Sequence, residues 1–194
     1  KDQWSGKIKF VFQPGEERIP GGAKLMLEEN LFGEEEPVLM VAQHVYPDLE
    51  AGKVGFRSGQ YMASSDEIYI TIQGKGGHAA LPDRLVDPIL IASNIVVALQ
   101  QIVSRNNKPG TPTVLSFGKI EGQGAVNVIP DKVYLEGTFR TMDEEWRKQA
   151  HKNLENITNG IASSMGGSAE IEIRHGYPVL YNNPGLTSSL KQFT

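Results

Sequence analysis

The chain has 194 residues, a formal net charge of −4 and 39% hydrophobic residues, values typical of a globular protein of one large or two small domains. Its lysines and arginines are scattered, so the basic surface expected for a nucleic-acid or anionic-membrane partner is absent. No apolar run approaches the length of a membrane span. The absence of cysteine excludes disulfides and is compatible with a cytoplasmic protein, which we expect here.

The first 58 residues predict one part of a larger α/β domain. The apolar runs at 7–14 and 37–45 are typical of buried strands. Between them, the spacing of Ala23, Met26, Leu27 and Leu31 predicts a helix that ends near Gly33. A strand, helix, strand (βαβ) unit belongs in a larger sheet, because two parallel strands do not form a stable sheet alone. The acidic run at 34–36 is interpreted as a solvated loop.

Residues 59–175 predict a second domain that looks complete. The alternation in 66–74 places Ile68, Ile70 and Ile72 on one face of a strand, and the segments 111–122, 132–141 and 169–178 predict three more strands. Asp87 and Pro88 predict the start of a helix that runs to about residue 105. The order βαββαβ predicts a ferredoxin-like fold, a four-stranded antiparallel sheet with two helices on one face.

The second helix of this domain is predicted from its cap and its apolar stripe. Thr141 and Glu144 form a capping-box signature at its start. Helical spacing then relates Trp146, Ala150, Leu154, Ile157, Ile161 and Met165. His151 is expected on the exposed side of this helix, and we assign no role to His175.

Two groups of polar residues follow the predicted strands of the first region. Glu16 and Glu17 come after the first strand, and His44 lies near the end of the second, so all three are expected at one edge of the sheet. Carboxylates and imidazoles ligate zinc and similar ions, and a neighbouring carboxylate can take the proton of an activated water. Paired surface glutamates and a structural histidine are the alternative interpretation, which remains open.

Three residues of the second region could contact a substrate. His78 ends a glycine-rich turn at 74–78, where it could polarise a carbonyl group, but it could also be a plain loop histidine. Asn127 could contact substrate or serve as a turn residue. Arg140 could bind a carboxylate or form a surface ion pair.

Seven segments occur in one order: FQPGEE, AQHVYPDL, MASSDEIYITIQGKGGHAALP, VDPI, AVNVIPD, LEGTFRT and RHGYP. Together they resemble the metallopeptidase family of aminoacylase, succinyl-diaminopimelate desuccinylase and carboxypeptidase G. The branch resembles hippurate hydrolases and hydrolases of indole-acetyl amino acid conjugates. The likeness covers nearly the whole chain, and it implies an internal piece of a longer enzyme. The family's upstream Cys-Gly-His motif and its downstream ligand histidine are not in this sequence.

The resemblance implies a domain plan and a metal site. It implies a partial metal-binding catalytic domain at 1–58, a lid or dimerisation domain at 59–175, and a return into the catalytic domain at 176–194. Glu16 would be the general base, and Glu17 and His44 would be metal ligands. The implied cofactor is one or two divalent ions, with zinc expected and manganese, cobalt or nickel as alternatives.

The resemblance also implies what the lid does. His78 would reach into the partner subunit's site and contact the scissile carbonyl, while Asn127 and Arg140 would contact substrate, Arg140 near its carboxylate. Two lid sheets would pair edge to edge in a homodimer. The whole enzyme would be a metal-dependent amidohydrolase that cleaves the amide bond of N-acyl amino acids or related conjugates.

Two other interpretations remain. The chain as it stands would be a non-catalytic dimerisation module, since two protein ligands are too few for a catalytic zinc site. We therefore expect no hydrolysis by the 194-residue chain itself. A whole protein that has lost catalysis is the third interpretation.

Overall fold

The computed structural model describes residues 5–193, and the chain divides into two compact units, Lys1–Pro47 and Asp48–Thr194. Each unit is considered by itself. The boundaries expected at 58/59 and 175/176 stay predictions.

The first unit holds one helix, α1 (Gly22–Glu28), followed by turns that include Gly33. This confirms the helix expected from the spacing of Ala23 to Leu31, but α1 ends at Glu28, before Leu31 and Gly33. The strands predicted at 7–14 and 37–45 are wrong, because neither segment is a strand among the described residues. Their apolar side chains are exposed, with Phe12 at 87% and Val38 at 102%. A strand forms only when a neighbouring segment pairs with its backbone, and no such pairing exists among the described residues of this unit.

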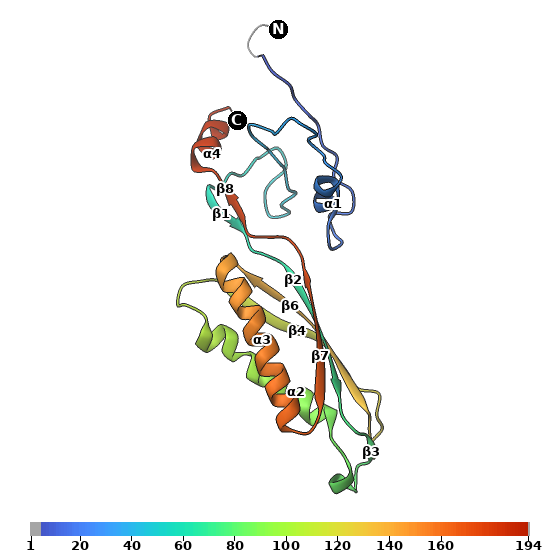
Figure 1. Cartoon of the computed structure of the whole chain (residues 1–194). Helices are drawn as coiled ribbons and strands as arrows, with labels where there is room; N and C mark the ends of the chain where they lie inside the picture. The colour runs from blue at the N-terminus through green and yellow to red at the C-terminus, as the bar shows by residue number, and fades with distance from the viewer. Residues whose placement is uncertain (1–4, 194) are drawn as a thin grey trace. The chain divides into compact units, whose positions relative to one another are not determined.

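The second unit is built around a four-stranded antiparallel sheet, here called the lid sheet, with two helices on one face (Figure 1). In spatial order the strands are β4 (Thr113–Glu121), β6 (Lys132–Thr141), β2 (Asp66–Gln73) and β7 (Ser168–His175). The predicted βαββαβ order and the antiparallel sheet are confirmed. The outermost strands β4 and β7 each leave one edge without a partner in the described chain.

The strand register of the lid sheet places the apolar side chains of β2 on the face that the helices cover. β2 pairs with β6 and with β7 over its full length without a shift, so Ile68, Ile70 and Ile72 all point to the helical face. These three side chains are at most 1% exposed. Each buried isoleucine contributes about 1.5–3 kcal/mol relative to an exposed one. The alternation read from 66–74 therefore reports the inner face of the central strand.

Both lid helices begin at an aspartate. α2 (Pro88–Leu99) is capped by Asp87, whose Oδ1 accepts from the backbone N–H of Ile89 at 2.8 Å and of Leu90 at 3.2 Å, as expected. α3 (Glu144–Ser164) is capped by Asp143 and not by Thr141, which lies buried in β6. The capping-box prediction was therefore wrong, since the carboxylate two residues later makes the cap.

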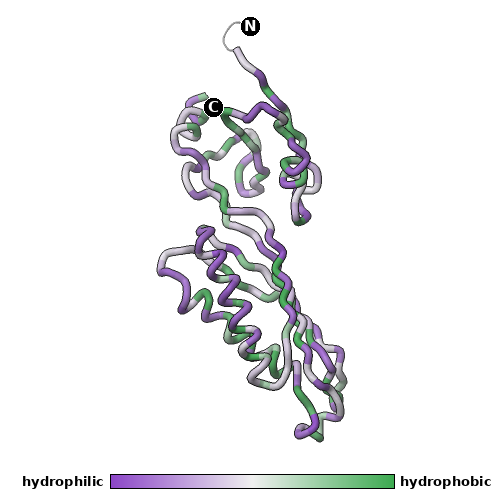
Figure 2. Tube along the Cα trace, viewed as in Figure 1, coloured by the Kyte–Doolittle hydropathy of each residue, from purple (hydrophilic) through white to green (hydrophobic). Residues whose placement is uncertain are grey.

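A short π-helix, η2 (Ile102–Asn106), follows α2 closely. By length and composition alone, the segment Pro88–Asn106 could cross a membrane, and it is the one such helix in the described chain. Its inner side is packed into the lid instead, because Ile91, Ile95, Leu99 and Ile102 are fully buried. Figure 2 shows apolar residues recurring along this helix. An apolar helix of this kind is a core helix.

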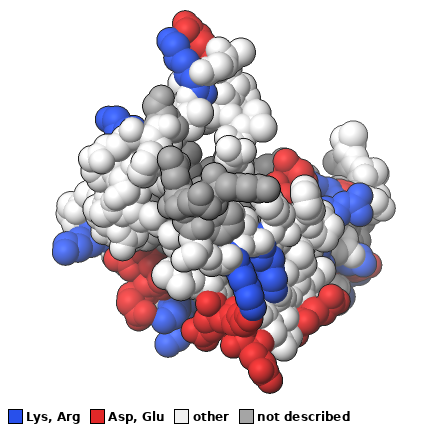
Figure 3. All heavy atoms as spheres, turned by 90° about the horizontal axis from the view of Figure 1, so that it is seen from above, with Lys and Arg blue, Asp and Glu red and all other residues white. Residues whose placement is uncertain are grey.

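Shorter elements extend the unit at both ends of the lid sheet (Figure 1). At one end, β1 (Gly59–Met62) pairs with β8 (Leu180–Asn182), which leads to α4 (Pro184–Lys191). At the other end, β3 (Gly77–His78) pairs with β5 (Val128–Ile129), and the short helix η1 (Pro82–Arg84) follows β3. On the face drawn in Figure 3, basic side chains lie in small groups beside acidic ones.

Candidate functional site

His78 stands on a projecting loop, here called the histidine arm (residues 74–86). The arm leaves the lid sheet after β2 and returns at α2. Backbone hydrogen bonds between Lys75 and Val86 close its base, at 2.8 and 2.9 Å. Early in the arm, β3 pairs with β5, which aligns His78 with Val128. The side chain of His78 is exposed. The arm therefore presents an exposed imidazole beyond the end of the lid sheet.

The structure brings Asn127 next to His78. The carbonyl of Asn127 accepts a hydrogen bond from the N–H of Ala79 at 3.0 Å. Within the arm, the N–H of Ala80 lies 3.1 Å from His78 Nδ1. A backbone N–H can only donate, so Nδ1 is the acceptor and the neutral ring carries its proton on Nε2. His78 is thus arranged to donate a hydrogen bond outward through Nε2.

Arg140 lies at the opposite end of the lid sheet from His78. It is exposed near the end of β6 and pairs with Val114 of β4, whereas the histidine arm adjoins the beginning of β6. With a rise of about 3.3 Å per residue, the eight steps from Lys132 to Arg140 span roughly 26 Å. One chain therefore does not bring His78 and Arg140 together.

The predicted metal ligands lie in the first unit. Glu16, Glu17 and His44 are exposed, in segments without regular structure. His44 Nδ1 lies 2.6 Å from the carbonyl oxygen of Val45, which can only accept, so Nδ1 carries the ring proton. Nε2 is then the nitrogen that can ligate a metal, and histidine ligands commonly hold a carbonyl in this way. The donor set fits a divalent ion, and the assignment of Glu17 and His44 stays a prediction.

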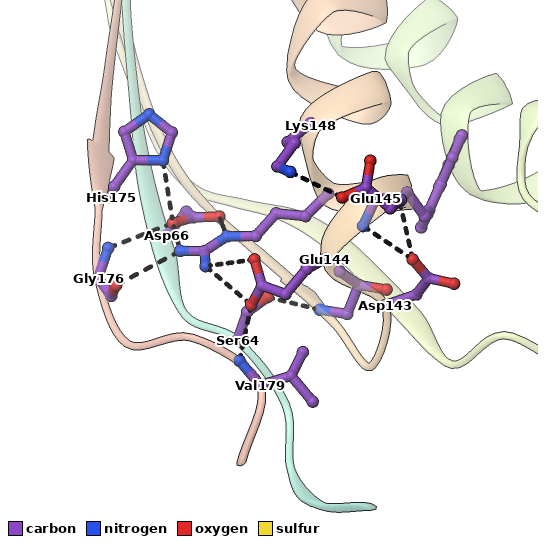
Figure 4. Close-up of polar contacts among 12 residues, drawn as sticks. Ser64, Asp66, Asp143, Glu144, Glu145, Lys148, His175, Gly176 and Val179 are labelled. Atoms are coloured by element: carbon purple, nitrogen blue, oxygen red, sulfur yellow. Dashed lines mark hydrogen bonds and ion pairs between the residues drawn. The ribbon is translucent and has the colours of Figure 1, made fainter. Parts of the chain in front are cut away.

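The structure reveals a buried polar cluster at the neck of the lid, where β2 begins and β7 ends (Figure 4). Its centre is Asp66, which is fully buried. Arg147 donates from both Nε, at 2.8 Å, and Nη2 to the Asp66 carboxylate. His151 Nε2 lies 3.0 Å from Oδ2, and the N–H of Gly176 lies 3.2 Å from Oδ1. Arg147 also contacts both oxygens of Glu144 at 3.1 Å.

The charges of this neck cluster stabilise one another. Burial by itself would raise the pKa of Asp66, but hydrogen bonds from Arg147 and His151 outweigh it and hold the pKa well below its usual value. The hydrogen bond with Asp66 is the main reason why the pKa of Arg147 is raised. Asp66 and Arg147 are therefore both charged in the folded protein at neutral pH.

The neck cluster also contains a group of metal-ligating side chains. Ligand atoms of Asp66, His151 and His175 lie within 4.8 Å of one another, the one such group of three among the described residues. Both oxygens of Asp66 already accept hydrogen bonds, and the Arg147 guanidinium is bound to the same carboxylate. A cation there would be repelled by Arg147 and would have to displace it. The chemistry of this group favours a structural ion pair.

The expectation for His151 was wrong: it is 7% exposed, not on the exposed side of α3. The buried face of α3 includes Arg147, His151 and Thr158. Each of these follows directly after a residue of the apolar stripe that begins at Trp146. The sequence carried one signal of this cluster. Asp66 alternates in step with Ile68, Ile70 and Ile72, so it lies on the same face of the strand. A charged residue on an apolar strand face requires a buried partner.

These features define an α/β domain: a ferredoxin-like sheet with helices on one face and an arm that presents a histidine. Residues 64–165 match the family described as "Peptidase dimerisation domain". The chain belongs to the M20 family of peptidases.

Curated relatives and solved structures agree with this assignment. The chain is 39% identical over 191 residues to the N-acetyl-L-cysteine deacetylase of Bacillus subtilis, covering 98% of this chain and 45% of the relative. It is also 39% identical to the N-acyl-L-amino acid amidohydrolase of Geobacillus stearothermophilus, covering 95% and 50%. A dinuclear metal-binding peptidase of the M20 family from Bacillus subtilis superposes with a TM-score of 0.67 at 30% identity, covering 93% of this chain and 44% of that one. The chain spans about half the length of the curated relatives it matches.

Proposed function

We propose that this chain is part of a metal-dependent amidohydrolase that cleaves the amide bond of N-acyl amino acids. Two relatives named for the removal of acyl groups from amino acids are 39% identical to nearly the whole chain. The observation that carries the proposal is the histidine arm, on which the exposed His78 presents a hydrogen-bond donor. A donor of this kind stabilises the negative charge that develops on a carbonyl oxygen during acyl transfer.

In this proposal, Glu17 and His44 hold a divalent metal ion, with His44 using Nε2. Zinc is the expected ion, and manganese, cobalt and nickel suit the same donors. When bound, the ion supplies Lewis-acid chemistry. Glu16 takes a proton from the attacking water and passes it to the leaving amine.

The proposed homodimer pairs the lid sheets through β4, the edge strand beside α2. Apolar side chains are exposed there, with Val114 at 48% and Ile120 at 58% on β4 and Val97 at 74% on α2. An exposed edge strand is a ready site for pairing, and two identical edges pair about a two-fold axis. Burial of these side chains would add hydrophobic stabilisation to the backbone hydrogen bonds.

Antiparallel pairing of two β4 strands would also bring His78 of one subunit to the same end of the sheet as Arg140 of the other. The start of β4 lies beside Arg140 and its end lies toward the histidine arm. A two-fold axis would bring the start of one β4 strand next to the end of the other. The arm of the partner would then lie on the same side as Arg140 of this chain. We infer a composite site in which His78 and Asn127 come from one subunit, while Arg140 of the other binds the substrate carboxylate.

Substitution of Glu16 tests the proposed reaction in the whole protein. Glu16→Gln keeps the size of the side chain but cannot carry the proton, so turnover of an N-acetyl amino acid should be lost while metal content is unchanged. Glu36→Gln, in the loop at 34–36, is the matched control and should leave turnover unchanged. Turnover by Glu16→Gln at the rate of the unchanged protein would remove the mechanism.

A second function is supported by the completeness of the lid within the unit Asp48–Thr194. The 194-residue chain by itself would be a non-catalytic dimerisation module. Calorimetry with zinc on this chain tests the module: weak or absent binding supports it, whereas stoichiometric nanomolar binding contradicts it.

A further inference from the structure

The histidine arm is braced at its root by Asp131. This residue lies between β5 and β6, directly after the buried Pro130. Its carbonyl oxygen accepts from the N–H of Gly74 at 2.8 Å. Its side-chain Oδ1 accepts from the N–H of Gly76 at 2.9 Å. Asp131 therefore holds both Gly74 and Gly76 at the start of the arm, the first through its backbone and the second through its carboxylate.

The arm and the Asp131 turn approach each other too closely for a side chain. A Cβ atom on Gly76 would lie 2.4 Å from the carbonyl oxygen of Ile129 and 2.7 Å from the carbonyl carbon of Pro130. The next residue, Gly77, has a φ of +149°, which side-chain-bearing residues rarely adopt. These two glycines let the Gly76 N–H reach the carboxylate and then turn the chain toward His78. The brace is thus two residues from the imidazole.

The direction of the His78 ring depends on the backbone of the arm. The contact with Nδ1 comes from Ala80, which is itself part of the arm. The arm's contact with Asn127 is made through the backbone of Ala79. A change in the path of the arm would therefore carry the ring and its Nε2–H with it.

We propose that Asp131 is a positioning residue for His78: its carboxylate fixes the Gly76 N–H and so sets where the His78 Nε2–H points. This inference rests on the proposed role of His78. The carboxylate acts through the arm, by its hydrogen bond to the Gly76 N–H. The pairing of β3 with β5 does not use this side chain, so the fold of the arm should survive its removal. What should be lost is the fixed direction of the hydrogen-bond donor, to which oxyanion stabilisation is sensitive.

A double-mutant cycle in the whole protein tests this inference. Asp131→Ala, His78→Ala and the double variant are compared by kcat and KM on an N-acetyl amino acid that the unchanged protein hydrolyses. Asp131→Ala should lower kcat about tenfold and change KM by less than about twofold, since the donor acts on the transition state. In the His78→Ala background the same substitution should change kcat by less than about twofold.

Two further variants separate positioning from folding. Asp131→Asn keeps an oxygen acceptor for the Gly76 N–H and should restore most of kcat. Asp83→Ala removes an exposed carboxylate of the same arm, which pairs with Arg84 at 3.9 Å, and should leave kcat unchanged.

The results that overturn the inference differ from those that overturn the proposed function. Equal losses of kcat from Asp131→Ala with and without His78 would show that Asp131 does not act through the imidazole. Losses in Asp131→Asn as large as those in Asp131→Ala would contradict the role of the acceptor. Unchanged kcat in His78→Ala alone would instead remove the proposed catalytic role of His78, and with it the basis of the inference.

Discussion

Removal of Arg147 should destabilise the second unit more than any exposed charge substitution. Asp66 is fully buried, and Arg147 supplies two of the N–H groups that its carboxylate accepts (Figure 4). Arg147→Met fills a similar volume but leaves a buried carboxylate that keeps His151 and the Gly176 N–H as hydrogen-bond partners and loses its guanidinium. Breaking a buried ion pair by removing one partner costs about 3–5 kcal/mol. We therefore expect Arg147→Met to lower the free energy of unfolding by that amount.

Urea denaturation of the 194-residue chain at pH 7, followed by circular dichroism, measures this effect. Lys148→Met is the matched control on the same helix, because Lys148 pairs with Glu145 at 2.7 Å but both side chains are exposed. Water screens an exposed pair of this kind, so the control should change the free energy of unfolding very little. The double variant Asp66→Asn, Arg147→Met should recover part of the loss, because the unpaired charge is gone. Equal effects of Arg147→Met and Lys148→Met would refute the reasoning.

Three further predictions concern the second unit. Because folding lowers the pKa of Asp66, its ion pair contributes stability above the unfolded carboxyl pKa of about 3.9, and this stability is lost as pH falls through the folded pKa. Asp66→Asn should therefore make the free energy of unfolding depend less on pH in the acid range. An unchanged pH dependence would contradict the assignment. Asp87→Ala removes the cap of α2 and should cost about 1 kcal/mol in urea denaturation, whereas Asp83→Ala should cost almost nothing; equal losses would count against the cap. Ile120→Glu should shift the whole protein from dimer to monomer in sedimentation experiments while the exposed Asn159→Glu on α3 leaves the dimer intact; an unshifted Ile120→Glu would rule out pairing through β4.

The lid was predictable because its signals are local. Alternating isoleucines in 66–74 and the Asp87-Pro88 start of α2 lie within a few residues of the features they specify. The neck cluster was missed because it depends on distant partners. Asp66 is 81 residues from Arg147 and 85 from His151 in the sequence. Nothing near His151 in the sequence indicates that this histidine is buried.

The first unit shows the opposite error. The apolar runs at 7–14 and 37–45 have the composition of buried strands, yet neither is a strand among the described residues. Composition reports what a segment requires from its surroundings, and a strand also requires a neighbour. The candidate site was also predictable only in part, because its geometry depends on how distant segments pair. His78 and Asn127 lie close because β3 pairs with β5, which comes much later in the sequence, and the distance from His78 to Arg140 follows from the length of β6.

Subunit exchange tests the proposed composite site most directly. Glu16→Gln and His78→Ala variants of the whole protein should each be nearly inactive as homodimers. Mixing them under conditions of exchange would create heterodimers in which one site has both Glu16 and the partner's arm. Random exchange should then restore about a quarter of the unchanged activity, since half of the dimers are mixed and each holds one intact site. No recovery after verified exchange would contradict the account, because His78 would not serve the site of the partner subunit.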